Sequence, residues 1–333
     1  MDAGSAGGRS KVLSIVGPGR SGTTILASIL GEVPGVVSAG EIRWLWQRGV
    51  LEQRSCGCSR PPTQCPLWSV VLDRVLGMDF AGDERGLPAL RAILGAQAEV
   101  ALLRNRLRVI RRAARTGATW PAFDRMHRVT ATVCSTLVEQ TQAKVIVETS
   151  KRAQEAAVFA SLDSVDHYVL HIVRDPRAVA YSWRRRKPAG PGSEHRTMSP
   201  RRLVPSVTRW TENSVGAELL RRQLPNDRWL FVRYEDLVAE PRGTVDRVLA
   251  FLDLEPTSPF DDERTVTLGP NHIVAGNPSR FRHGPVRIVA DNEWQQQMSK
   301  WDQLCVAGLA LPLLLRYGYP TRMPGTGKPA AAR

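Results

Sequence analysis

Lysine is scarce in this chain of 333 residues, because arginine and lysine together number 46 and only six of these are lysines. The formal net charge of +14 is therefore carried mainly by arginine. The densest basic runs, 104–115 and 184–187, lack the interleaved aromatic residues of a nucleic-acid-binding surface. Solvated helix faces explain such runs, and an anionic substrate or a membrane surface is the alternative. Nucleic acid is not an expected partner.

Long apolar runs are also missing. No stretch reaches the roughly 18 residues that a membrane-spanning helix needs, and the C-terminal run 306–315 is too short as well. The first ten residues are polar and glycine-rich, without the apolar centre of a signal peptide. We therefore expect a cytoplasmic protein with no transmembrane segment. Cysteines stay reduced in that compartment, so Cys134 and Cys305 are expected to be buried thiols.

The other three cysteines, Cys56, Cys58 and Cys65, lie within ten residues of one another. A structural zinc ion would need a fourth ligand. None lies nearby in the sequence, so His127 or Cys134 would have to come from elsewhere. Free thiols in a structural turn, a disulfide and a metal site are all open at this stage.

A lysine is also missing from a glycine-rich loop near the start of the chain. Residues 17–24, Gly-Pro-Gly-Arg-Ser-Gly-Thr-Thr, match the phosphate-loop pattern G-x-x-x-x-G-K-[ST] except that Thr23 replaces the lysine. The apolar residues 12–16 predict a buried strand, and residues 25–30 predict a helix. This context favours a loop that binds phosphate at a helix N-terminus but does not bind a γ-phosphate. A turn without a ligand is the alternative. The predicted donors are Gly19, Arg20, Ser21, Gly22, Thr23 and Thr24.

The loop resembles the 5′-phosphosulfate loop of sulfotransferases that use 3′-phosphoadenosine 5′-phosphosulfate (PAPS). Those enzymes also carry an arginine followed eight residues later by a serine, and the pair holds the 3′-phosphate. Arg174 and Ser182 have this spacing. The apolar residues 168–173 predict a strand, and Pro176 fits the first residue of a helix. Arg174 would then lie at the carboxyl end of a strand, where open parallel sheets bind ligands.

Two later segments resemble the same family. Tyr234 opens a Tyr-Glu-Asp-Leu segment whose tyrosine lies near the adenine in these enzymes, although a packing role at a strand end is also open. Residues 272–284 resemble the H-x-x-x-G-N-P-x-R-F segment of bacterial members. The resemblance implies a loop over the nucleotide, with Arg280 and Arg282 directed to phosphate. It covers residues from about 12 to 294, but little of 44–143.

The base for sulfuryl transfer is expected to be Glu41. Transfer requires a group that takes the acceptor proton, and residues 147–151 lack the histidine that cytosolic small-molecule sulfotransferases use there. Glu41, which follows the first predicted helix, resembles the catalytic glutamate of protein-tyrosine sulfotransferases, with Arg43 in the place of a nearby arginine. A solvated loop residue is the alternative.

Cationic stabilisation is expected from Lys151 and Arg20. Lys151 resembles the lysine of the D-S-S-K segment in bacterial relatives, which approaches the leaving oxygen. It would emerge at the same sheet edge as the phosphate loop. Alternatively, Lys151 pairs with Glu148 and has only a structural role. The reaction is expected to require no metal, because arginines and loop donors supply the positive charge that magnesium supplies to kinases.

Strands that alternate with helices predict an α/β protein with a three-layer parallel sheet. The resemblance implies the P-loop NTPase-like sulfotransferase fold. We expect a disordered leader over 1–10 and a single domain over 11–320. Within the domain, a mostly helical insertion on the acceptor side covers 44–143 and contains one long amphipathic stretch over 87–114. A disordered tail follows over 321–333.

These observations predict a bacterial-type sulfotransferase that moves a sulfuryl group from PAPS to a hydroxyl or amine and releases 3′-phosphoadenosine 5′-phosphate (PAP). A small molecule, glycan, lipid or natural product is expected as acceptor, a protein tyrosine is not excluded, and the oligomeric state is open. A P-loop kinase or NTPase is one alternative, although the loop lysine and a clear acidic strand end for magnesium are missing. A nucleotide-binding sensor without turnover is another.

Overall fold

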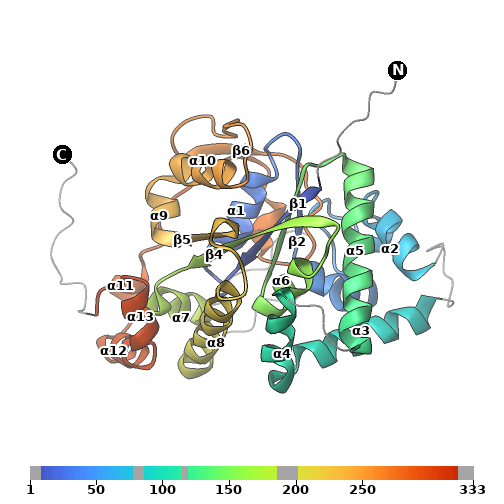
Figure 1. Cartoon of the computed structure of the whole chain (residues 1–333). Helices are drawn as coiled ribbons and strands as arrows, with labels where there is room; N and C mark the ends of the chain where they lie inside the picture. The colour runs from blue at the N-terminus through green and yellow to red at the C-terminus, as the bar shows by residue number, and fades with distance from the viewer. Residues whose placement is uncertain (1–8, 78–85, 115–118, 186–201, 322–333) are drawn as a thin grey trace.

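The computed structural model describes residues 9–77, 86–114, 119–185 and 202–321. A twisted sheet lies at its centre with helices packed on both sides (Figure 1). Five strands follow the order β2-β3-β1-β4-β5, and all neighbouring pairs are parallel. The strands are β1 Ser10–Val16, β2 Val36–Gly40, β3 Val145–Lys151, β4 Val165–Val173 and β5 Trp229–Arg233. The predicted three-layer parallel α/β architecture is confirmed.

The alternation of side chains along β1 builds a core on each face of the sheet. Leu13 and Ile15 pack into one core, while Val12 and Val16 pack into the other. The first core is covered by α1 Thr23–Leu30, α9 Tyr234–Ala239 and α10 Pro241–Phe251. The second is covered mainly by α2 Trp68–Leu76, α3 Leu87–Ala101, α5 Pro121–Thr141 and α6 Ala153–Ala160. Both faces of the central strand β1 are therefore buried from solvent.

The described part of the region between β2 and β3 is mostly helical, and the long amphipathic stretch predicted over 87–114 is divided into several helices. Helix α3 ends at Ala101, because Leu102 is extended with ψ 139°. The chain then turns, so that α3 packs on α5 while the next helix, α4 Arg106–Arg111, packs on α6 and on α8 Leu203–Arg221. Because α3 and α4 pack on different helices, the chain has to change direction between them. The remaining elements are η1 Ile42–Trp44, η2 Leu45–Leu51, η3 Pro62–Gln64, η5 Leu103–Asn105 and η6 Arg112–Ala114.

A third core lies beyond β4, where Val173 packs with helices from the C-terminal part of the chain. These helices are α7 Pro176–Arg184, α8 Leu203–Arg221, α11 Trp294–Gln297, α12 Lys300–Leu309 and α13 Leu311–Arg316. Cys134 is buried as expected, but Cys305 on α12 is exposed, so the prediction of a buried thiol there is wrong.

Three strands were not predicted from the sequence. β2 lies between α1 and Glu41, so Glu41 follows a strand and not the first helix. β6 Thr265–Leu268 and β7 Gly284–Arg287 form a separate antiparallel pair. η7 Asn226–Arg228 precedes β5, and η8 Pro278–Phe281 precedes β7.

The predicted leader and tail lie almost entirely outside the described residues, although β1 already begins at Ser10, within the predicted leader. The role of 44–143 as an acceptor-side insertion stays a prediction. Among the described residues, no helix has the length and apolar character needed to cross a membrane.

Candidate active site

The carboxyl ends of all five strands of the parallel sheet meet at one cleft. Residues that line it include Arg20 after β1, Glu41 after β2, Lys151 at the end of β3, Arg174 after β4 and Tyr234 after β5. Open parallel sheets bind ligands at this edge. The cleft has a volume of about 2180 Å³, well above the roughly 300–1,000 Å³ of an ordinary small-molecule site. It therefore has room for two ligands side by side.

The phosphate-loop sequence forms the turn between β1 and α1, as the pattern predicts. Gly17 has φ 134°, and a Cβ placed there would lie 2.0 Å from the carbonyl oxygen of Ile172. Gly22 has φ 80° and caps α1, and a Cβ there would lie 2.8 Å from the ring of Tyr234. Both positions require glycine. The backbone thus packs directly on β4 and α9, with the first N–H groups of α1 at the cleft.

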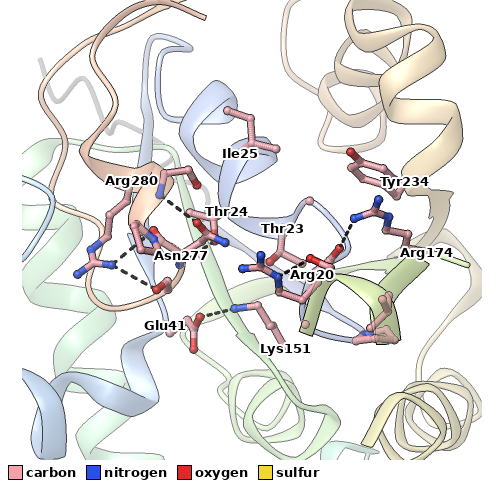
Figure 2. A pocket seen from close by; sticks show the side chains of 18 of the residues that line it. Arg20, Thr23, Thr24, Ile25, Glu41, Lys151, Arg174, Tyr234, Asn277 and Arg280 are labelled. Atoms are coloured by element: carbon pink, nitrogen blue, oxygen red, sulfur yellow. Dashed lines mark hydrogen bonds and ion pairs between the residues drawn. The ribbon is translucent and has the colours of Figure 1, made fainter. Parts of the chain in front are cut away.

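Arg20 and Arg174 bring the two predicted phosphate motifs into contact. Nε of Arg20 donates to Oγ of Ser182 at 3.0 Å, and Nη1 of Arg174 donates to the carbonyl oxygen of Arg20 at 3.3 Å. The guanidinium of Arg174 lies 4.3 Å from the ring centroid of Tyr234, within cation–π distance. Figure 2 shows Arg174 between Tyr234 and the loop.

The charge of the cleft is strongly positive. Its lining contains twelve basic side chains and four acidic ones. Burial, reinforced by Arg174 and Arg185, lowers the pKa of Arg20 to about 10. Burial likewise lowers the pKa of Arg280 to about 10. Both side chains still carry their charge at neutral pH, so crowded, desolvated cations line a space that a polyanion would stabilise.

Lys151 and Glu41 form an ion pair across the cleft, in which Nζ of Lys151 donates to Oε1 of Glu41 (Figure 2). Only 15% and 11% of their side-chain surfaces are exposed. The amide of Gly17 donates to the carbonyl oxygen of Lys151 at 3.1 Å, which fixes the lysine beside the phosphate loop. The Glu41 amide donates to the carbonyl oxygen of Val274 at 2.8 Å.

Glu148, the other partner considered for Lys151, has a different environment. Its side chain is fully buried, and Oε2 accepts a hydrogen bond from the amide of Ser150 at 2.7 Å. Burial raises its pKa to about 8. The ion pair of Lys151 is formed with Glu41 instead. Arg43 lines the same cleft and forms its own ion pair, in which Nε lies 3.4 Å from a carboxylate oxygen of Glu155.

The segment that contains Arg280 lies against the phosphate loop. The amide of Asn277 donates to Oγ1 of Thr24 at 3.4 Å. Arg280 directs its terminal nitrogens to backbone carbonyl oxygens, including that of Gly276 at 3.2 Å and that of Ser55 at 3.2 Å. Arg282 lines the same cleft. The structure thus places both arginines in the wall, with Arg280 tied to its own segment and to the start of the cysteine-rich turn.

Asp291 is a site residue that sequence reasoning missed. Its carbonyl oxygen accepts from Nη2 of Arg174 at 2.6 Å, and its carboxylate lies 2.5 Å from Nη2 of Arg185. Trp183 was also missed, and its ring lies 5.6 Å from the Arg20 guanidinium. Asp291 belongs to no motif that marks it, whereas Trp183 directly follows Ser182 on α7 and could have been found from that position.

A model of the sulfotransferase family matches residues 165–259, which include β4, Arg174, Ser182, β5 and Tyr234. A search of curated proteins found no match. The sulfotransferase domain of the Synechococcus PCC 7002 olefin synthase is 18% identical, covers 94% of this chain and 96% of its own, and has a TM-score of 0.46. The sulfotransferase domain of the curacin biosynthetic pathway is 16% identical, covers 94% of this chain and 99% of its own, and has a TM-score of 0.49.

A third solved structure, sulfotransferase STF9 from Mycobacterium avium, is 11% identical, with 94% of this chain and 78% of that chain covered and a TM-score of 0.47. The family model covers residues 165–259, less than half of the chain. That model covers the second predicted motif, while the likeness of Glu41 to the base of protein-tyrosine sulfotransferases stays a prediction. Residues 165–259, which contain β4, Arg174, Ser182 and Tyr234, are therefore similar to the sulfotransferase family.

Proposed function

We propose that the chain transfers a sulfuryl group from PAPS to a hydroxyl or amine of an acceptor. The observation that carries this proposal is the contact between Arg20 of the phosphate loop and Ser182 of the second motif, 3.0 Å apart beside Arg174. PAPS carries anionic groups at both its 5′ and 3′ ends. A donor of this kind needs two phosphate sites on one protein edge, and the two motifs supply them.

Each part of the PAPS molecule can be matched to residues of the cleft. The N–H groups of residues 19–24 and the side chain of Arg20 would hold the 5′-phosphosulfate. Arg174 and Ser182 would hold the 3′-phosphate, and Tyr234 would pack near the adenine. Arg280 and Arg282 would contribute positive charge from the covering segment.

Two buried atoms support the fit of an anion at this place. In the part of the chain that the structure describes, Oγ of Ser21 and Nε of Arg174 are buried without a hydrogen-bond partner. Unsatisfied buried donors destabilise a protein by roughly 1–3 kcal/mol each. Phosphate oxygens would satisfy them.

For the chemistry, Glu41 accepts the proton of the acceptor hydroxyl or amine. The acceptor atom bonds to sulfur while the bond between sulfur and the 5′-phosphate oxygen breaks, so PAP leaves with the negative charge. Arg20 and Lys151 would stabilise that charge. Protein donors would supply all of this positive charge. The acceptor would occupy the remaining volume of the cleft beside Glu41, within the reach of residues from 44–143.

Calorimetry separates this proposal from its rivals. We expect PAP to bind tightly without metal, whereas ATP with magnesium binds weakly or not at all. Preference for ATP with magnesium would favour a kinase or NTPase and sink the proposal. PAPS incubated with a panel of alcohols, phenols, amines and glycans should then yield PAP and a sulfated product. Binding of PAP without donor hydrolysis or product on any acceptor would point to a sensor.

A further inference from the structure

Four potential metal ligands converge at the edge of the cleft. The Sγ atoms of Cys56 and Cys58 lie 3.2 Å apart, and those of Cys56 and Cys65 lie 3.7 Å apart. Nδ1 of His272 lies 3.1 Å from the sulfur of Cys65 and 4.0 Å from that of Cys56. All four ligand atoms lie within 4.8 Å of one another. His272 supplies the fourth ligand that could not be found near the cysteines in the sequence.

The surrounding backbone fixes this geometry. The amide of Cys58 donates to the sulfur of Cys56 at 3.5 Å, and Ser59 closes the turn in the left-handed region with φ 67°. The Gly57 amide donates to the carbonyl oxygen of Ile273 at 3.0 Å. A Cβ at Gly57 would lie 1.8 Å from Oδ1 of Asn271, so only glycine allows this contact. The cysteine turn is therefore built against residues 271–273.

Trp68 holds the histidine segment from the other side. Its indole Nε1 donates to the carbonyl oxygen of His272 at 2.7 Å. Cys56, Cys65 and Trp68 are completely buried. Three ligands from one turn and a fourth from a segment 207 residues further along are thus held in a preformed group.

We propose that Cys56, Cys58, Cys65 and His272 bind one structural Zn²⁺ ion. Zinc in structural sites is tetrahedral, and three cysteines with one histidine are one of its usual ligand sets. A Zn–S bond of about 2.3 Å places neighbouring sulfurs roughly 3.8 Å apart. The two sulfur–sulfur distances are 3.2 and 3.7 Å. A Zn–N bond of about 2.1 Å places nitrogen roughly 3.6 Å from each sulfur, and the observed distances from Nδ1 of His272 are 3.1 and 4.0 Å. Soft thiolate ligands select zinc over magnesium or calcium. Binding releases the thiol protons, so three thiolates and a neutral imidazole give the loaded site a net charge of −1.

The two other possibilities left open by the sequence fit less well. A disulfide needs sulfurs about 2.05 Å apart, and it would pair two of the cysteines while leaving the third beside His272. Free thiols would account for the contact of Cys65 with His272 as a hydrogen bond from sulfur to nitrogen, but they give no reason for all four ligand atoms to lie within 4.8 Å of one another. A metal uses all four groups at once.

The ion would fasten the cysteine turn to the segment over the phosphate loop. From His272 the chain continues to Val274, whose amide and carbonyl pair with Ala39 and Glu41, and to Asn277, which contacts Thr24. Arg280 returns to the turn by donating to the carbonyl oxygen of Ser55. The zinc would therefore position the wall of the donor site, a role that depends on the proposed function.

Elemental analysis of the full chain, purified without an affinity metal, tests the site directly. We expect about one zinc per chain and no iron. Cys56→Ser and His272→Ala should lower the zinc content several-fold, because loss of one ligand weakens a structural site. Cys305→Ser, an exposed cysteine outside the cluster, is the matched control and should retain full zinc. Iron in place of zinc, or no metal with a mass two daltons low from a disulfide, would overturn the proposal.

Variants of buried ligands can fail to fold, so the unmutated chain supplies a second measurement. After chelation, three additional thiols should react with a thiol reagent, and added Co²⁺ should give thiolate-to-cobalt charge-transfer bands. Equal thiol reactivity before and after chelation would contradict a bound ion.

The positioning role has its own readout. Zinc-free protein should bind PAP at least tenfold more weakly than zinc-loaded protein, and readdition of Zn²⁺ should restore the affinity. Equal PAP affinity in both forms would refute the positioning role. Zinc in protein that binds no PAP in either form would instead count against the proposed function and leave the metal site intact.

Discussion

The Arg20 side chain donates from Nε to Oγ of Ser182 at 3.0 Å, although 162 residues separate the two in the sequence. Arg174 reaches the same point by donating to the carbonyl oxygen of Arg20. A loop after β1 and a helix after β4 are therefore joined directly. This contact makes the assignment of the donor's two ends testable one residue at a time.

Arg174→Ala should weaken PAP binding by about 2–3 kcal/mol, the usual loss when a charged partner is removed, and Ser182→Ala by about 1 kcal/mol. Adenosine 5′-phosphate lacks the 3′-phosphate, so its affinity should change much less in both variants. Calorimetry with both nucleotides measures this difference.

Arg184→Ala provides the control on the same helix, because Arg184 is half exposed and pairs with Asp302. It should leave the affinity for both nucleotides unchanged. Equal weakening of PAP and adenosine 5′-phosphate by Arg174→Ala would show that the arginine does not contact the 3′-phosphate.

Glu41→Gln should lower the rate of sulfuryl transfer by about 10²–10⁴-fold, the usual contribution of a general base. Its affinity for PAP should stay within about threefold of the unmutated value, because the proposed donor contacts are unchanged. Lys151→Ala should reduce the rate as well, since the leaving phosphate loses a cation. Single-turnover rates with an acceptor found in the panel measure both effects.

Glu139→Gln, an exposed glutamate paired with Arg74, is the control for this pair and should transfer at the normal rate. Full turnover by Lys151→Ala would show that its ion pair with Glu41 is structural. Full turnover by Glu41→Gln would remove Glu41 as the base.

Gly22→Ala should lower PAP affinity at least tenfold and decrease the free energy of unfolding by about 1–2 kcal/mol. The φ of 80° strains any residue with a Cβ, and that atom would lie 2.8 Å from the ring of Tyr234. Gly95→Ala within α3 is the contrasting change, because a Cβ there meets nothing within 4 Å. It should stabilise the protein by about 0.5–1 kcal/mol and leave PAP binding alone. Denaturant titration measures the free energy of unfolding, and calorimetry measures the affinity for PAP. If Gly22→Ala changed neither quantity, the loop would tolerate a Cβ at this position.

Glu148 should make the protein less stable as the pH rises. Burial raises its pKa from 4.5 to about 8. Between these values the unfolded carboxyl has lost the proton that the folded one keeps. The free energy of unfolding therefore falls through this window by up to about 1.4 kcal/mol per pH unit. Below pH 4.5 the carboxyl of Glu148 is protonated in both the folded and the unfolded state, so it no longer makes the free energy of unfolding depend on pH.

Glu148→Gln should remove this dependence. The variant's free energy of unfolding, relative to that of the unmutated chain, should rise by on the order of 4 kcal/mol between pH 4.5 and pH 8, as measured by denaturant titration. Parallel pH profiles for the variant and the unmutated chain would show that Glu148 ionises normally in the folded protein.

The sequence by itself determined the local parts of this protein. Residues 17–24 and Arg174 could be placed at strand ends because apolar runs, glycines and Pro176 act over a few neighbouring residues. The same local patterns predicted the three-layer sheet. They could not predict the break at Leu102, because the two helix directions there depend on which distant helices pack on each part.

Only the tertiary structure decided which distant groups meet. β2 is short and becomes a strand by pairing with β3, so the true position of Glu41 was not visible in its own neighbourhood. The partner of Lys151 proved to be Glu41 and not the nearby Glu148. His272 joins the cysteines from 207 residues away from Cys65. Such contacts depend on how whole helices and strands pack together. The residues next to a side chain in the sequence do not determine that packing.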